Sequence, residues 1–544
     1  MIKVVVVGGV AGGMSAATRM RRLDESAEIV VFEAGPYVSF ANCGLPYYVG
    51  GVIESRDSLL VQTPDVLAAR FNLDVRVSTE VVAIDRDSRT VTFRDLASGV
   101  TGQQQYDYLV LSAGARATPI AGEGSRAVTL RTIDDVDVIV STLESSGPDA
   151  TAVVVGGGFI GLEAVDNLVR RGVRTSLVQR GLRLFSPLDP EMATLVLDEV
   201  RSRGVDVYLG TTVTDITEHT VELSDGTSLS TDLIIDAAGV RPATGLARAA
   251  GLTIGPTGGI AVDDRHRTSD PAIFAVGDGA EKQDASDGSA TLVTMAGLAN
   301  RHGRAVADTI AGRGQQAAPA LGTAIIGVFG LTVATVGWNE TRLVAEGRGH
   351  RVIHTHPASH ATYYPGAEAM SMKLLVDPVS DLILGAQIVG GAGVDKRIDV
   401  IATAMSAGLT ASALKDLELA YAPQYASAKD PVNMLGYVAD NLRAEPDSSV
   451  QWHELEAARQ QGDTLVDVRS VAEFTAGHVP GAVNVPLEEL RQRHGELRGD
   501  LIVHCQVGQR GHTATRMLSQ LGHRVRNLDG GYRTWLAGAA SARG

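Results

Sequence analysis

Two cysteines, Cys43 and Cys505, are the residues best suited to carry electrons or sulfur in this chain of 544 residues. Cys43 lies within "VSFANCGLPYYVGG", and Cys505 ends the apolar stretch "LIVHC". Two cysteines so far apart do not give the pattern of a disulfide-stapled secreted protein. We therefore expect two free thiols in a reducing compartment, the cytoplasm.

A single thiol at Cys43 can store an electron pair only through an atom bonded to its sulfur. Position 48, where a second redox cysteine would complete a CxxxxC pair, is Tyr48. The remaining options are a sulfenic acid and a mixed disulfide with a small thiol from solution. The residues around Cys43 leave both options open.

The chain begins with the pattern of a dinucleotide-binding βαβ unit. "IKVVVVGGVAGGMSAATRMRR" reads as a strand, a glycine turn and a helix, and "AEIVVFEAG" reads as a second strand that ends at Glu33. Gly8 permits the tight turn, Gly12 lets the helix pack close to the sheet, and Glu33 can accept hydrogen bonds from a ribose. Val10 replaces the middle glycine of GxGxxG. Because the run of valines before the glycines is only four residues long, we expect a buried strand here and not a signal peptide.

The same pattern returns in "TAVVVGGGFIGLEAVDNLVRRGVRTSLVQRG", which has the complete set Gly156, Gly158 and Gly161. Gln179 occupies the position where an acid would bind the ribose of NADH. Arg180 follows, and it could either meet the 2′-phosphate of NADPH or remain a solvated surface charge. The sequence leaves the choice between NADH and NADPH open.

Three later segments complete the pattern: "DYLVLSAGARA", "DLIIDAAGVRP" and "TSDPAIFAVGDGAE". With two dinucleotide folds, the second inserted into the first, residues 1 to about 440 resemble the FAD-dependent pyridine-nucleotide disulfide oxidoreductases. The resemblance implies that FAD binds the first fold, that NAD(P)H binds the second, and that the acid after Gly277 contacts the flavin ribityl chain. The implied FAD residues are Gly8, Val10, Ala11, Gly12, Glu33, Ala113, Gly277 and Asp278, and the implied NAD(P)H residues are Gly156, Gly158, Ile160, Gly161, Gln179 and Arg180.

The string "SFANCGLPY" resembles the coenzyme A disulfide reductases, and so do "TYYPGAE" and "YAPQYASAKDPVNM". The resemblance implies that Cys43 alternates between a thiolate and a mixed disulfide with coenzyme A. It also implies a homodimer in which Tyr363 and Tyr421 reach the site of the other chain. Related NADH peroxidases and oxidases carry a histidine where this chain has Val10, which argues against the sulfenic acid. The coenzyme A contacts implied are Ser15, Arg19, Arg22, Ser39, Asn42, Asn300 and Lys429, and the alternative for Arg19 and Arg22 is an exposed polar helix face.

The C-terminal segments "TLVDVRSVAEFTAGHVPGAVNVP" and "LIVHCQVGQRGHTATRMLSQLG" resemble a rhodanese domain. We expect the loop after Cys505 to curl into a helix beginning near His512. Backbone N–H groups of such a loop, together with the charge of Arg510, favour a thiolate. A thiolate at Cys505 could accept a sulfane sulfur as Cys–S–S⁻ and pass it on.

Composition narrows the remaining possibilities. The net charge is −15, with no long basic run and no apolar stretch of transmembrane length, so we expect no binding to nucleic acid or membrane, and we predict no metal. The predicted fold is α/β: two Rossmann-like domains, an α+β dimerisation domain and a C-terminal α/β rhodanese domain. The predicted limits are 1–112 with 238–318 for FAD, 113–237 for NAD(P)H, 319–440 for dimerisation, 441–450 for a polar linker, and 451–544 for the rhodanese.

The function that these predictions favour is the reduction of coenzyme A disulfide, coenzyme A persulfide or polysulfide by NAD(P)H. It would proceed through FAD and a Cys43–S–S–CoA bond, with Cys505 carrying sulfane sulfur. Two alternatives stay open. One is an NADH oxidase or peroxidase that uses a sulfenic acid at Cys43, and the other is a sulfurtransferase with an ancillary reductase.

Overall fold

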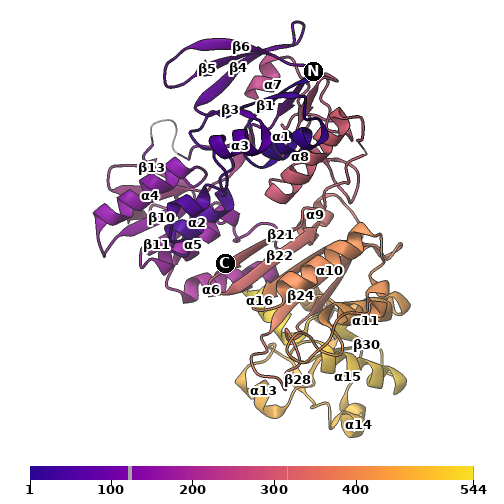
Figure 1. Ribbon diagram of the computed structural model, residues 1–544. Helices are drawn as coiled ribbons and strands as arrows, with labels where there is room; N and C mark the ends of the chain where they lie inside the picture. Colours follow the sequence, from indigo (N-terminus) through magenta and orange to yellow (C-terminus); the bar gives the residue numbers. More distant parts are fainter. Residues whose placement is uncertain (121–124, 315, 543–544) are drawn as a thin grey trace. The chain divides into compact units, whose positions relative to one another are not determined.

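The computed structural model describes residues 1–120, 125–314 and 316–542, and it forms two compact units (Figure 1). The first unit contains Met1–Arg180 and Asp206–Ala320, and the second contains Gly181–Val205 and Leu321–Gly544. The architecture is α/β, as predicted. No helix in the described ranges is long and apolar enough to cross a membrane.

A five-stranded parallel sheet forms the core of the first unit, in the order β18-β7-β1-β2-β3. Its strands are β1 (Lys3–Val7), β2 (Glu28–Phe32), β3 (Asp74–Arg76), β7 (Tyr108–Leu111) and β18 (Ile273–Ala275). The run of valines in β1 is buried, as expected for a strand covered on both faces. Helices α1 (Ala11–Leu23) and α8 (Ala296–Ile310) pack against each other beside this sheet.

Glycines allow α1 to approach the turn that precedes it. Gly8 has a φ of 104°, a conformation that a side chain would strain, and a Cβ at Gly13 would overlap the carbonyl oxygen of Gly8. On the other side of α1, a Cβ at Gly303 of α8 would overlap the carbonyl oxygen of Gly12. The glycine turn is therefore enclosed by backbone from two directions.

A second five-stranded parallel sheet, in the order β12-β11-β10-β16-β9, repeats the same design. Its elements are β9 (Val128–Thr129), β10 (Thr151–Val155), β11 (Arg174–Gln179), β12 (Asp206–Leu209) and β16 (Leu233–Asp236), with α4 (Ile133–Ser146) and α5 (Phe159–Arg170). A Cβ at Gly161 would overlap the carbonyl oxygen of Gly156, which itself has a φ of 109°. A Cβ at Gly158 would meet open space.

Smaller elements complete the first unit. Two three-stranded antiparallel sheets are formed by β4 (Thr79–Asp85), β5 (Thr90–Asp95) and β6 (Thr101–Gln105), and by β13 (Val213–Ile216), β14 (Thr220–Leu223) and β15 (Ser228–Ser230). Short helices include η1 (Asn42–Gly44), α2 (Leu45–Val49), η2 (Arg56–Leu59), α3 (Pro64–Phe71), α7 (Gly245–Ala249) and η3 (Gly277–Gly279). Two pairs of short strands remain, β8 (Ala115–Ala117) with β17 (Val240–Pro242) and β19 (Lys282–Gln283) with β20 (Ala290–Thr291).

An antiparallel sheet in the order β21-β22-β25-β24-β23 begins the second unit. Its strands are β21 (Ala324–Val328), β22 (Leu331–Gly337), β23 (Arg351–Thr355), β24 (Met370–Val376) and β25 (Ile383–Gly390). The accompanying helices are α9 (Glu340–Ala345), α10 (Val394–Ser406), η4 (Ser412–Asp416) and α11 (Pro431–Ala444). A core of Ile, Leu, Met and Val side chains fills the space between this sheet and α10 and α11.

Helix α6 (Pro190–Ser202) belongs to this second unit, although the predicted NAD(P)H domain, 113–237, includes it. Asp189, which precedes α6, accepts hydrogen bonds from Gln387 Nε2 at 2.6 Å and from the backbone N–H of Glu340 at 3.0 Å. These bonds fasten the start of α6 to β25 and α9.

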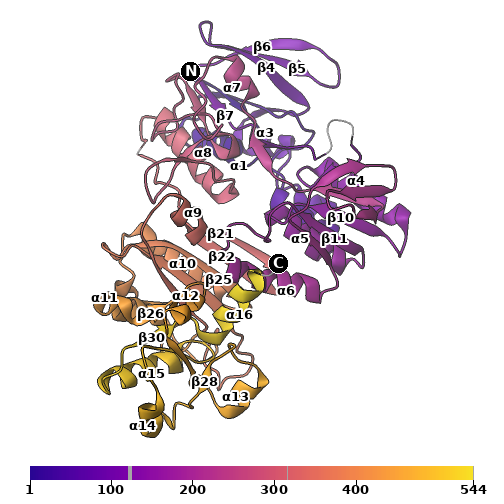
Figure 2. The same ribbon diagram turned by 180° about the vertical axis from the view of Figure 1, so that it is seen from behind.

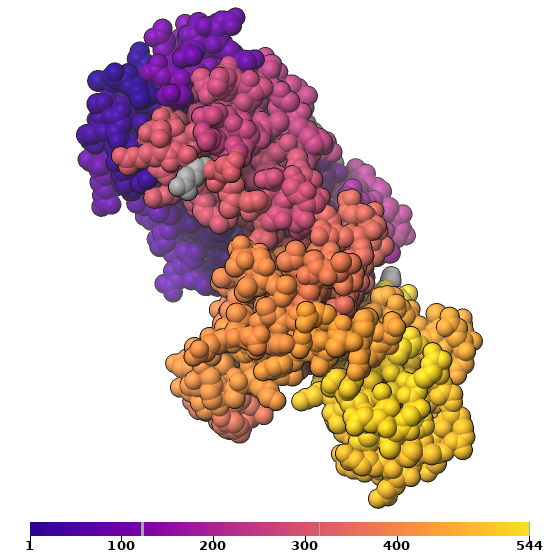
Figure 3. Space-filling model, turned by 90° about the vertical axis from the view of Figure 1, so that its right-hand side faces the viewer, coloured from indigo at the N-terminus to yellow at the C-terminus, as the bar shows by residue number. Residues whose placement is uncertain are grey.

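The C-terminal domain is a parallel sheet in the order β26-β30-β29-β27-β28 with helices around it. Its elements are β26 (Ser449–Val450), α12 (Leu455–Gln460), β27 (Thr464–Asp467), α13 (Val471–Ala476), β28 (Val483–Asn484), α14 (Leu490–Arg493), η6 (His494–Glu496), β29 (Leu501–His504), α15 (Gln509–Gln520), β30 (Val525–Leu528) and α16 (Gly531–Ser541). Helix α16 lies beside α6, with Thr194 Oγ1 donating to the carbonyl of Ala537 at 3.1 Å (Figures 1 and 2). Figure 3 shows the surface of this domain in yellow.

The stretch predicted as a linker, residues 441–450, has regular structure. Helix α11 continues to Ala444, a 3-10 turn η5 follows (Pro446–Ser448), and β26 already pairs with β30. The helix after Cys505 begins at Gln509, three residues before the predicted His512.

We expect Gly303→Ala to lower the thermal unfolding midpoint, because its Cβ would push α8 away from the backbone of α1. Overpacking of this kind costs about 1–3 kcal/mol. Gly297→Ala on the same helix is the matched control, because a Cβ there meets open space. Differential scanning calorimetry of both variants tests the prediction, and equal midpoints would contradict it.

Candidate functional site

A cavity of about 660 Å³ opens at the carboxyl ends of β1, β2 and β7 in the first unit. This is the edge of a parallel sheet at which nucleotides bind. The cavity collects residues from the first glycine turn, from the end of β2, from the loop that holds Cys43, and from η3. Of the predicted residues, those lining it are Gly8, Val10, Ala11, Gly12, Glu33, Asn42, Cys43, Ala113, Gly277 and Asp278.

Glu33 directly follows β2 and Gln179 ends β11, the corresponding strand of the second fold, and the two side chains make corresponding hydrogen bonds. Glu33 Oε2 accepts from the N–H of Gly9 at 2.7 Å, and Gln179 Oε1 accepts from the N–H of Gly157 at 2.9 Å. Each side chain thus holds the glycine turn beside it and keeps lone pairs for a ribose. Arg180 is exposed, so both of its predicted roles stay open.

Lys282, which the sequence analysis did not identify, supports the turn that carries Asp278. Its Nζ is buried and donates to the carbonyls of Gly277 at 2.5 Å and Ala280 at 2.8 Å. Burial lowers the pKa of Lys282 to about 8. Burial also raises the pKa of Asp278, against the opposing charges of Lys282 and Arg131. No sequence motif marked Lys282, because its partners are backbone carbonyls.

These residues fit an FAD cradle. The glycines leave room for the backbone to approach a pyrophosphate, Glu33 lies at the end of β2 where a ribose would bind, and the Gly277–Asp278 turn also lines the cavity. Glu33 and Asp278 would hold hydroxyl groups, and the N-terminus of α1 would face the phosphates.

Cys43 is exposed within η1, at the wall of this cavity. Partial desolvation of the thiol by the atoms around it raises its pKa, and the nearby carboxylates of Glu163 and Asp278 raise the pKa further. The next helix, α2, packs against α5 of the second dinucleotide fold. Cys43 therefore lies where the two dinucleotide folds meet within the first unit.

Glu163 is the second residue near the site that the sequence analysis missed. Tyr47 donates its hydroxyl to Glu163 Oε1 at 3.0 Å, and burial with this neighbour raises the pKa of Tyr47 to about 12. Burial also raises the pKa of Glu163. The available signal was an acid two residues after Gly161 on the helix that faces the cysteine.

The predicted coenzyme A residues of the first unit form two groups. Ser15 donates to Asn300 Oδ1 at 2.6 Å, and Arg19 pairs with Asp308 of α8 at 2.6 Å. A phosphate at Arg19 would therefore compete with a carboxylate. Arg22 is exposed and stacks on Phe71 at 5.0 Å.

Ser39 and Asn42 lie on the loop that carries Cys43. Ser39 has a φ of 48°, in the left-handed region, and its N–H donates to the carbonyl of Gly9 at 2.8 Å. Asn42 Oδ1 lies 3.9 Å from the sulfur of Cys43. The loop that carries the thiol is thus tied to the first glycine turn.

Tyr363 and Tyr421 are brought together in the second unit. Their hydroxyl oxygens are 2.8 Å apart, while the residues are 74% and 49% exposed. The hydrogen bond from Tyr421 raises the pKa of Tyr363. Lys429 is exposed and precedes Asp430, which caps α11 and pairs with Arg397 at 3.0 Å.

Cys505 is buried at the end of β29, in the loop before α15. Arg510 forms a bidentate ion pair with Glu473, at 2.6 and 2.8 Å. Its pKa is raised by Glu473 and, in smaller part, by Cys505. The predicted positive charge is thus present beside the sulfur but is shared with a carboxylate.

Family models match three segments of the chain. Residues 2–301 match the model of the pyridine nucleotide-disulphide oxidoreductases, and residues 323–431 match the dimerisation domain of the same enzymes. Residues 451–538 match the rhodanese-like domain.

Several known proteins are similar to this chain in sequence or in structure. A coenzyme A disulfide reductase of Staphylococcus haemolyticus is 34% identical over 443 residues, which is 81% of this chain and the whole of that protein. The structure of reduced Bacillus anthracis CoADR-RHD has a TM-score of 0.97 and 44% identity, over 99% of this chain and 98% of that one. The structure of an NAD-dependent persulfide reductase from A. fulgidus has a TM-score of 0.91 and 36% identity, over 98% of this chain and all of that one.

We expect Glu163→Gln to lower the pKa of Cys43, because the substitution removes a nearby negative charge that disfavours the thiolate. The midpoint of the pH profile for alkylation of Cys43 by iodoacetamide should then move to lower pH. Peptide mass spectrometry separates this alkylation from that of Cys505. Glu25→Gln, an exposed site on the same unit, is the control and should leave the profile in place. A shift to higher pH in Glu163→Gln would overturn the electrostatic assignment.

Proposed function

Because the chain belongs to the coenzyme A disulfide reductases of the pyridine nucleotide-disulphide oxidoreductase family, we propose that Cys43 turns over as a mixed disulfide with coenzyme A. The chain is an NAD(P)H-dependent reductase of coenzyme A disulfide and persulfide, with FAD as its cofactor. The observation that carries the proposal is the placement of one exposed thiol, with no cysteine at position 48, against the dinucleotide cavity.

FAD, when bound, supplies a two-electron carrier that can accept a hydride from NAD(P)H. The residues of the cavity wall would bind and orient it, and Cys43 at the same wall would accept the electron pair. Two-electron reduction of a Cys43–S–S–CoA bond breaks that bond, and it leaves the Cys43 thiolate and the coenzyme A thiolate. One proton then converts the coenzyme A thiolate into the free thiol.

The Cys43 thiolate next attacks a sulfur of the incoming substrate. With coenzyme A disulfide, the attack forms Cys43–S–S–CoA and releases one coenzyme A thiolate. With coenzyme A persulfide, attack on the sulfur bound to carbon forms the same mixed disulfide and releases hydrosulfide. Both substrates therefore converge on one bond that the enzyme must reduce.

The proton for the leaving thiolate is assigned to the tyrosine pair of the partner chain. The two hydroxyls already share a hydrogen bond, so one can donate outward while the other accepts. The large exposure of both rings in one chain supports their role at a site on a second copy. This assignment makes the working unit a homodimer. Lys429, which is exposed and lies in the same sequence motif as Tyr421, would meet the coenzyme A phosphates there.

The C-terminal domain is assigned a role in carrying sulfur. The Cys505 thiolate would attack the outer sulfur of a persulfide or polysulfide, form Cys505–S–S⁻ and expel the rest of the donor as a thiolate or shorter polysulfide. Attack of a coenzyme A thiolate on that outer sulfur would then form coenzyme A persulfide and release the Cys505 thiolate. Burial at the end of β29 would protect such a species from bulk solvent. The proposed location is the cytoplasm, where both thiols stay reduced.

We expect Cys43→Ser to reduce NAD(P)H-dependent turnover of coenzyme A disulfide and coenzyme A persulfide to background, because the serine oxygen cannot form the mixed disulfide. Cys505→Ser, as the matched substitution, should keep turnover of coenzyme A disulfide. Mass spectrometry of the oxidised wild-type protein should find a coenzyme A adduct on the Cys43 peptide. Peroxide-dependent NADH consumption that exceeds coenzyme A disulfide turnover would contradict the proposal and favour a sulfenic acid.

A mixed dimer tests whether the tyrosines act across chains. One chain carries Cys43→Ser and the other carries Tyr363→Phe with Tyr421→Phe. If the site is shared, one of its two sites combines Cys43 with both tyrosines, so the mixed dimer should keep about half of the wild-type activity. Each parental homodimer should be reduced by about 100-fold or more, in line with the loss of a nucleophile or a general acid. An inactive mixed dimer would place the tyrosines in the site of their own chain.

A further inference from the structure

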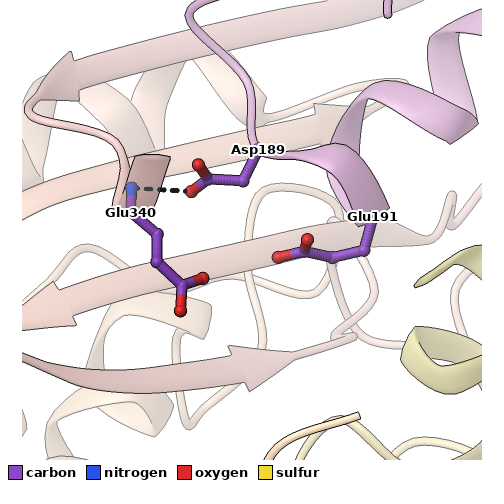
Figure 4. A group of neighbouring side chains, drawn as sticks. All are labelled: Asp189, Glu191 and Glu340. Carbon is purple, nitrogen blue, oxygen red and sulfur yellow. Dashed lines mark hydrogen bonds between the residues drawn. The ribbon is translucent and has the colours of Figure 1, made fainter. Parts of the chain in front are cut away.

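A buried chain of charged groups connects the antiparallel sheet of the second unit to the loop of Cys505. It begins at Lys373 on β24, whose ammonium bonds to Asp189 at 2.9 Å, Glu191 at 2.5 Å and Glu340 at 2.6 Å. Figure 4 shows these three carboxylates converging from α6 and α9. They lie close enough to hold a metal ion, but the Lys373 ammonium already supplies the cation between them.

His354, on the edge strand β23, continues the chain. Its Nε2 lies 3.1 Å from Glu191 Oε1, and its Nδ1 lies 2.7 Å from Asp529 Oδ2, while the backbone N–H of His354 also donates to Asp529 at 2.9 Å. The imidazole is 1% exposed. A neutral imidazole has one N–H and can donate to only one carboxylate, whereas the imidazolium can donate to both.

Asp529 begins the turn that supports the Cys505 loop. Gly530 and Gly531 follow it with φ values of 64° and 65°. A Cβ at Gly531 would lie 2.5 Å from the carbonyl oxygen of Cys505, and one at Gly530 would lie 2.8 Å from Cβ of His354. The turn is thus enclosed between β23 and the cysteine loop, with no room for side chains.

The first residues of α16 bond directly to the cysteine loop. The N–H of Tyr532 donates to the carbonyl of Cys505 at 2.8 Å, and the N–H of Arg533 donates to the carbonyl of Gln506 at 3.0 Å. Directly after β23, His356 Nε2 contacts Thr534 Oγ1 at 2.8 Å. A shift of this turn would therefore move the backbone that carries the Cys505 sulfur.

We propose that His354 is a positioning residue for sulfur transfer at Cys505, holding through Asp529 the glycine turn on which the cysteine loop rests. The inference depends on the proposed sulfur-carrying role of Cys505. It assigns the antiparallel domain a second task, to fix the geometry of the C-terminal thiol.

The electrostatics agree with this arrangement. Burial alone would lower the pKa of His354, but the hydrogen bonds to Asp529 and Glu191 raise it to about 9. The double hydrogen bond is therefore fully present at neutral pH and is lost as the pH rises through about 9. The charged and titratable groups around His354 and His356 are Glu191 and Asp189 from the start of α6, Glu340 from α9, His350, Lys373 from β24, Asp529 and Arg533.

The test is single-turnover transfer of sulfane sulfur from thiosulfate to Cys505 in the full-length holoenzyme. The rate is measured from the release of sulfite, between pH 7 and pH 10.5. The Cys505 thiolate takes the outer sulfur and sulfite leaves with its electron pair. Wild-type transfer should fall above about pH 9, although a thiolate population can only grow with pH. His354→Gln should be slower by about tenfold or more at pH 7.5 and should lack the fall at high pH, because small displacements of a reacting group have large effects on rate.

Asp529→Asn is a second variant for the same measurement, used if His354→Gln folds poorly. It keeps an acceptor for His354 but removes a charge that raises its pKa, so the high-pH fall should move to lower pH. His453→Gln, an exposed histidine of the same domain, is the control and should match wild type. In all three variants, reduction of coenzyme A disulfide through Cys43 should stay within about twofold of wild type.

The outcomes separate the inference from the function on which it depends. If Cys505→Ser abolishes sulfite release while His354→Gln and Asp529→Asn both leave rate and pH profile unchanged, the positioning role is wrong. If Cys505→Ser itself leaves sulfite release unchanged, the sulfur-carrying role of Cys505 is wrong.

Discussion

A lone thiol can hold two electrons only while another atom is bonded to its sulfur, and this constraint shapes the first unit. Cys43 has Tyr48 where a second cysteine would complete a redox pair, so its counterpart must arrive from solution. The thiol is accordingly exposed at the wall of the dinucleotide cavity. A buried pair could be shielded by the fold, whereas this site must stay open to a substrate and still approach the cofactor. The loop solves this geometrically, because Ser39 ties it to the first glycine turn while α2 packs against α5.

The dinucleotide folds could be predicted from the sequence because their signals are local. A buried valine strand, a glycine with positive φ and a helix follow within about fifteen residues, and no distant partner decides them. The match between Glu33 and Gln179 is an example, since each accepts from the N–H of the glycine turn beside its own strand. The position of α6 could not be predicted in this way. It packs in the second unit because Lys373 on a buried strand requires carboxylates, and Asp189 and Glu191 from the start of α6 supply two of them. Nothing in the sequence near residue 190 indicates that these carboxylates contact a lysine so much later in the chain.

The difference between local signals and contacts with distant residues also applies to the candidate site. Residues within motifs, such as Gly277 and Asp278, line the cavity together with the first glycine turn. Residues whose roles depend on tertiary contacts were either not predicted or have partners that the sequence did not indicate. Lys282 contacts only backbone carbonyls, and Glu163 meets Tyr47 across a gap of more than one hundred residues. Arg19 was predicted to contact coenzyme A, but its guanidinium forms an ion pair with Asp308 from α8. A helix face read from one segment gives the direction of a side chain, but not the charge that another helix brings to it.

The two thiols are set up for different tasks, and their surroundings explain how. Burial and the carboxylates of Glu163 and Asp278 raise the pKa of Cys43. In a mixed disulfide the thiol of lower pKa is the better leaving group, so a raised pKa at Cys43 favours departure of the small thiol and retention of the sulfur on the enzyme. The environment that raises the pKa of Cys43 therefore makes its sulfur the poorer leaving group in that bond. Cys505 has the opposite design, since it is buried, its carbonyl is bonded to α16, and Arg510 lies beside it. An open sulfur that exchanges with solution and a fixed sulfur held by backbone are complementary when one chain must both break a sulfur–sulfur bond and carry the sulfur that bond releases.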